Sequence, residues 1–85
     1  MPYIKQEDRK KLEPILAEFD KMNRDDITAG DLNYLITSML LMTNPSSYKA
    51  YNALIGVLEC CKLEFYRRAV SLHEEEAIER NGDIF

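Results

Sequence analysis

The feature that most constrains the fold is an uninterrupted stretch from Ser46 to Arg80, which contains no proline and a single glycine, Gly56. Read as an α-helix, with a rise of 1.5 Å per residue, about 35 residues would span roughly 50 Å. Globular helices average about 11–12 residues, so this helix would outreach any compact monomer built from the rest of the chain. Its middle, Ala50 to Tyr66, is apolar on nearly every side, and such a helix needs neighbours all round. The stretch therefore predicts self-association.

The remaining residues predict two shorter helices, so that a single helical domain, 1–85, would hold helices at about 8–22, 29–42 and 47–80. Pro14 conflicts with an unbroken first helix, because an interior proline removes a hydrogen bond and clashes with the preceding turn; we expect a kink or two pieces. Thr28 and Asp31 are spaced as a capping box at the start of the second helix, and Asn44-Pro45 ends it. The predicted fold class is all-α: two short helices plus one long C-terminal helix, assembling as a helical-bundle oligomer.

Composition excludes some classes of partner. The 85 residues are 46% apolar and 31% charged, with a net charge of −4, which is typical of a soluble folded protein and argues against a general nucleic-acid coat. The longest apolar segment, Leu32 to Met42, is too short to cross a bilayer. The first residues lack the apolar core of a signal peptide. We expect a cytoplasmic protein with neither nucleic acid nor membrane as partner.

No set of residues converges on catalysis, a metal or a cofactor, and we expect none of the three. Cys60 and Cys61 are adjacent, which makes a disulfide between them geometrically rare, so both are expected to be buried free thiols. His73 has no nucleophile or metal partner at a suitable spacing. The run from Glu75 to Glu79 matches the EExxE half-motif of the all-helical nucleoside-triphosphate pyrophosphohydrolases, but no later helix supplies the second acidic pair.

The long helix carries the predicted self-association surface. A glycine inside a helix costs about 1 kcal/mol relative to alanine, and close contact with another helix at Gly56 would offset that cost. The expected interface combines this glycine with its apolar neighbours along the helix. Its residues are Tyr51, Ile55, Gly56, Leu58 and Phe65.

Polar side chains interleaved with this apolar stretch form the candidate binding site. The arginine guanidinium can donate two hydrogen bonds to one phosphate, and tyrosine can stack on a base while its hydroxyl donates a hydrogen bond. A solvated face with ion pairs, a polar network inside an interface, and a pocket for an anionic or nucleotide-like ligand all remain open. The candidate residues are Asn52, Glu59, Lys62, Tyr66, Arg67 and Arg68 on the long helix, with Asn33 and Tyr34 of the second helix expected nearby.

Four runs of residues stand out together: Pro2-Tyr3-Ile4, the LNYLIT run at 32–37, the GVLECCKLEFYRR run at 56–68, and Asn81-Gly82-Asp83. With these runs the chain resembles a family of short, functionally uncharacterised proteins of bacteriophages and bacteria. The resemblance covers nearly the whole chain. It implies a stand-alone, phage-associated protein with no assigned activity, located in the host cytoplasm if it is phage-encoded.

Two classes of function follow from the sequence. The first is a non-enzymatic homo-oligomer, a dimer or higher, that binds a host or phage protein. The alternative is an oligomeric sponge that sequesters a nucleotide-type signal, such as a cyclic nucleotide, at its subunit interfaces. The alternative rests on analogy with other small helical phage proteins. An enzyme is disfavoured.

Overall fold

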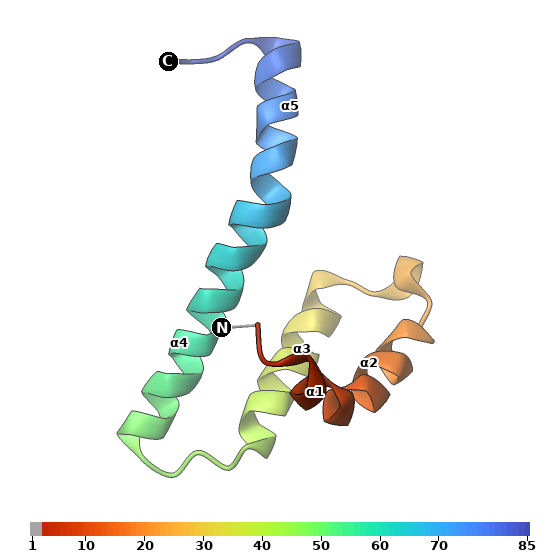
Figure 1. Cartoon of the computed structure of the whole chain (residues 1–85), viewed down its shortest axis with the longest axis vertical. Coiled ribbons are helices and arrows are strands. Elements are labelled where there is room, and N and C mark those ends of the chain that lie inside the picture. Colours follow the sequence, from red (N-terminus) through yellow and green to blue (C-terminus); the bar gives the residue numbers. More distant parts are fainter. Residues whose placement is uncertain (1–2) are drawn as a thin grey trace. The chain divides into compact units, whose positions relative to one another are not determined.

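The computed structural model describes residues 3–85, which are helical over most of their length and contain no strand (Figure 1). The predicted all-α class is confirmed, as is the order of two short helices followed by a long one. The chain groups into two compact units, one extending to Tyr51 and the other covering Asn52–Phe85. Assignment of 1–85 to one domain, and assembly into an oligomeric bundle, stay predictions.

The first helical segment is built in three pieces, where the sequence predicts a kink or two pieces. α1 (Gln6–Arg9) leads into a 3-10 turn, η1 (Lys10–Leu12), and then into α2 (Glu13–Asp20). Pro14 occupies the first turn of α2, where a missing N–H breaks no helical hydrogen bond. The segment therefore tolerates the proline by restarting the helix.

α3 (Ala29–Met42) has the bounds that the sequence predicts, 29–42. The N–H of Asp31 donates to Oγ1 of Thr28 (3.1 Å), and the N–H of Thr28 donates to Oδ2 of Asp31 (2.9 Å). This reciprocal pair satisfies two backbone donors that the helix itself leaves without partners. A short 3-10 turn, η2 (Arg24–Asp26), precedes α3, and Asn44 follows it with a left-handed φ of 55°.

The long C-terminal helix has an unpredicted wide turn. α4 (Tyr48–Phe65) passes into one stretch of π-helix, η3 (Tyr66–Val70), and then into α5 (Ser71–Asn81). The helix begins where Oγ of Ser47 accepts the N–H of Ala50 (3.1 Å). It ends at a glycine with φ of 88°, Gly82. The predicted long C-terminal helix is present and runs from Tyr48 to Asn81 with a π-helical stretch inside it. No helix of the described residues is long and apolar enough to cross a membrane.

None of the described residues is buried, which is unusual for a folded chain. Side chains such as Leu16 (66% exposed), Ile55 (64%) and Phe65 (67%) lie largely in the open. Surface apolar residues are common singly, but a folded chain ordinarily covers most of its large ones. Neither unit has a core of its own.

The expectation that both cysteines are buried is wrong. Both thiols are free, as predicted, but Cys60 is half-buried and Cys61 is exposed. Adjacent residues on a helix point about 100° apart. The two adjacent thiols therefore have different surroundings.

Candidate functional site

The wide turn of η3 holds three of the predicted polar residues, Tyr66, Arg67 and Arg68. An α-helix turns about 100° per residue, so residue i+7 lies nearly above residue i, and residue i+8 lies about 80° away. A π-turn accommodates one extra residue. It therefore brings residue i+8 into the place of i+7 and changes which side chains on either side of η3 share a face.

Tyr66 and Glu74 show this effect. They are eight residues apart, and the Tyr66 hydroxyl donates a hydrogen bond of 2.7 Å to Oε1 of Glu74. The hydrogen bond and the negative charge of Glu74 raise the pKa of the Tyr66 phenol above its ordinary value. Of the two partners, the sequence singles out only the tyrosine.

Arg67 makes the second set of contacts at the turn. Its Nη2 pairs with Oε1 of Glu64, while its backbone carbonyl accepts a hydrogen bond from the Ser71 hydroxyl (2.5 Å). The Glu64 side chain is only 19% exposed, whereas that of Arg67 is 66% exposed. The guanidinium thus extends into solvent while its carbonyl is satisfied within the turn.

A shallow depression of about 370 Å³ adjoins these contacts. It is lined by Cys60, Leu63, Glu64, Tyr66 and Arg67. Its lining combines a thiol and aliphatic carbon with a carboxylate, a phenol and a guanidinium. The depression combines an apolar surface with hydrogen-bond donors, which are the ingredients of a small-ligand site.

The other predicted polar residues of the long helix do not line this depression. Lys62 pairs with Glu59 over 2.9 Å, with side chains 67% and 55% exposed. Such an exposed i,i+3 pair contributes little to stability. Asn52 is exposed at the start of the second unit, and Arg68 lies within η3.

Asn33 and Tyr34 lie on α3, in the other unit. Oδ1 of Asn33 accepts a hydrogen bond from the Thr37 hydroxyl (3.3 Å), and Tyr34 is 73% exposed. Both line a hollow of about 620 Å³ along one side of α3. Their proximity to the polar residues of the long helix stays a prediction.

The five predicted interface residues are available on the surface. Tyr51, Ile55 and Phe65 are exposed, and Leu58 is half-buried. A Cβ added at Gly56 would have no atom within 4 Å. Nothing in the described chain accounts for a glycine at this point of the helix.

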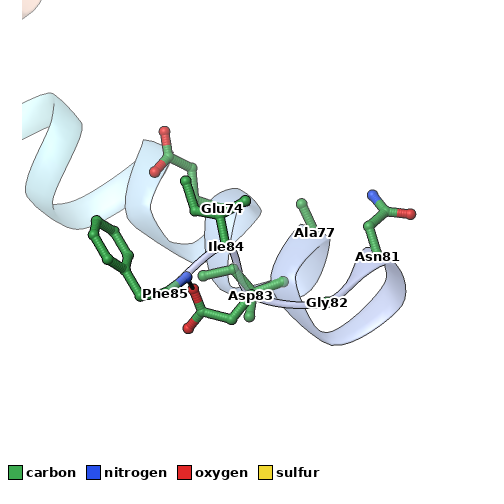
Figure 2. A pocket seen from close by; sticks show the side chains of 8 residues that line it. Glu74, Ala77, Asn81, Gly82, Asp83, Ile84 and Phe85 are labelled. Atoms are coloured by element: carbon green, nitrogen blue, oxygen red, sulfur yellow. Dashed lines mark hydrogen bonds between the residues drawn. The ribbon is translucent and has the colours of Figure 1, made fainter.

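Two further apolar features complete the surface. An apolar groove of about 640 Å³ lies between α2 and α3. A smaller hollow of about 380 Å³ lies where the tail after Gly82 passes α5; Figure 2 shows Ile84 and Phe85 beside it. The sequence shows apolar stripes on both short helices, but their spacing alone does not say that a groove between them stays open.

Among residues 3–85 no group of three or more His, Cys, Asp or Glu side chains is placed to hold a metal ion. The described residues form an all-helical protein with exposed apolar side chains. Residues 1–84 match the family described as a domain of unknown function (DUF6899), and the chain belongs to that family. Comparisons with curated proteins and with solved structures found no match.

The Tyr66–Glu74 hydrogen bond predicts a pH dependence. A raised phenol pKa means that folding favours the protonated tyrosine. Its stabilisation is complete below the ordinary pKa of about 10 and is lost as the pH rises through the higher folded value. We expect an ultraviolet titration to show one tyrosine ionising later in wild type than in Glu74→Gln. Identical titration curves for the two proteins would contradict this assignment.

Proposed function

We propose that this protein is a non-enzymatic helical interaction protein that works as a homo-oligomer and acts by binding a host or phage protein. One observation carries the proposal: none of the described residues is buried, although many are large and apolar. Burying one such side chain is worth about 1.5–3 kcal/mol. Contact with a protein partner stabilises helices with such a surface far more than exposure to water does.

Measuring the mass of the protein in solution tests the proposed homo-oligomer. Light scattering after gel filtration should give a multiple of the 9.9 kDa chain mass, and sedimentation equilibrium should give the number of copies. The melting temperature should rise with protein concentration, because assembly stabilises the folded chain by mass action. A 9.9 kDa species that melts at the same temperature across a hundredfold range of concentration would refute the proposal.

A nucleotide-type ligand at the η3 depression is the second candidate function. It is favoured by the phenol of Tyr66 and the guanidinium of Arg67, which line the depression together with Cys60 and Leu63. It ranks second because both groups already have carboxylate partners, Glu74 and Glu64. An anionic ligand would have to compete with these acids.

This second function has a separate test. If it holds, cyclic nucleotides should raise the melting temperature of wild type, and a purified sample that absorbs strongly at 260 nm would also favour it. Arg67→Ala should abolish the ligand response while leaving the melting temperature without ligand nearly unchanged. Arg80→Ala, an arginine in the last turn of α5, is the matched control and should respond as wild type does. No response in wild type would remove this candidate.

A further inference from the structure

The extra residue of η3 sets the rotational register of α5, that is, the direction in which its side chains point relative to those of α4. Tyr66 and Glu74 share a face although they are eight residues apart, as their hydrogen bond of 2.7 Å shows. In an unbroken α-helix the residue seven positions further on would occupy that place. The wide turn therefore rotates α5 by one residue, or about 100°, relative to an unbroken helix.

This rotation changes which residues continue the apolar face of α4. Phe65, the last residue of α4, belongs to the predicted interface and is 67% exposed. In an unbroken helix Leu72 and Glu79 would follow Phe65 in line, at successive intervals of seven residues. Because η3 brings residue i+8 into the place of i+7, His73 and Arg80 follow it instead.

The charge of this line changes with its residues. Arg80 takes the place that Glu79 would occupy, and one turn earlier Ala77 takes the place of Glu76. Both acids are exposed, whereas Ala77 is half-buried. The wide turn thus directs two carboxylates away from the line that begins at Phe65. An acid held in an apolar contact would lose its hydration without gaining a partner, so the observed register is the one that favours association along this face.

We propose that the π-turn of η3 is a register device for assembly, which holds His73 and Arg80 in line with Phe65 against a second copy of the chain. The inference rests on the homo-oligomer proposed above. A second copy offers an apolar line of the same length, and two-fold pairing of identical faces closes the assembly. π-Turns are rare and occur frequently at functional sites, and a role in assembly accounts for one in this helix.

Glutamate placed at two adjacent residues tests the register. His73→Glu puts a carboxylate in line with Phe65 and should raise the dissociation constant of the oligomer at least tenfold. Leu72→Glu is the matched control, because it adds the same side chain one residue earlier, where the structure places it off this line. It should leave the dissociation constant nearly unchanged, although leucine is the more apolar residue. Sedimentation equilibrium measures both, and a larger effect of Leu72→Glu would overturn the proposal.

Changes in chain length test the turn itself. Deleting Val70 removes the extra residue and leaves His73 seven residues after Phe65, so a continuous α-helix keeps the observed line, and assembly should match that of wild type. Inserting one alanine after Val70 rotates α5 by a further residue and brings Glu79 into the line. This insertion should raise the dissociation constant at least tenfold, and adding Glu79→Ala to it should restore part of the affinity.

The outcomes separate this inference from the homo-oligomer on which it rests. A monomeric wild type would overturn both. A wild-type oligomer whose affinity survives the insertion, or is lost on deleting Val70, would overturn the register device alone, provided that circular dichroism shows the helix intact. The glutamate variants keep the chain length, so they decide the question if a length variant loses its helix.

Discussion

Replacing Gly56 by leucine is expected to weaken assembly, although the same change would strengthen the isolated helix. Leucine is about 1 kcal/mol more favourable than glycine inside a helix, and a Cβ at this position meets no atom of the chain within 4 Å. If a helix of a second copy crosses here, added bulk at a close contact costs about 1–3 kcal/mol. That cost corresponds to a rise in the dissociation constant of roughly 5- to 150-fold.

Smaller substitutions provide the controls for this experiment. Gly56→Ala should weaken assembly less than Gly56→Leu. Gly30→Ala, in the first turn of α3, should leave the mass unchanged, because a Cβ there makes only ordinary contact with Thr28, at 3.6 Å. Sedimentation equilibrium measures the association, and thermal melting measures the helix. If both Gly56 variants melt at higher temperature and keep the wild-type mass, this face of the long helix is not an interface.

Removing the cap of α3 should give a large loss of stability for so small a change. Thr28→Ala deletes the hydroxyl that accepts the N–H of Asp31, and loss of such a cap costs about 0.5–2 kcal/mol. For a domain of this size, 1 kcal/mol shifts the melting temperature by about 4–8 °C. Circular dichroism should therefore show a lower melting temperature with little change in helical signal at low temperature.

Thr37→Ala is the matched control, because it makes the same chemical change inside the same helix. The Thr37 hydroxyl bonds only to the exposed side chain of Asn33, and alanine is the better helix former. We expect an unchanged or slightly higher melting temperature. Equal losses in the two variants would show that the hydroxyl of Thr28 has no particular role as a cap.

Local signals allowed the sequence to predict most of the secondary structure. The start of α3 is predicted by Thr28 and Asp31 because a capping box depends on residues only three apart. The restart at Pro14 follows from the missing N–H of proline. The length of the C-terminal helix follows from the lack of any breaker between Ser46 and Arg80. Each of these features depends on neighbours within about one turn of helix.

The candidate site was only partly predictable. Tyr66 and Arg67 stand out as polar residues in an apolar stretch, yet their partners do not. Glu74 is eight residues from Tyr66 and would lie on another side of an unbroken α-helix. Only the extra residue of η3 places the two on one face, and no local residue pattern marks that turn. The partial cover of Cys60 and the exposure of Cys61 were likewise not predictable from their types.

The sequence by itself therefore determined which segments are helical, where the cap of α3 lies and where Pro14 restarts the first helical segment. Helix caps, proline restarts and periodicity are local, and a few neighbouring residues decide them. The tertiary structure alone decided that the groove between α2 and α3 stays open, that the tail beyond Gly82 leaves Ile84 and Phe85 uncovered, and that the helix widens at η3. The groove depends on how side chains of two separate helices meet in space, and the same residues could equally have formed a closed core. The widening at η3 is accompanied by a hydrogen bond between residues eight apart, which is beyond the reach of signals confined to one turn of helix.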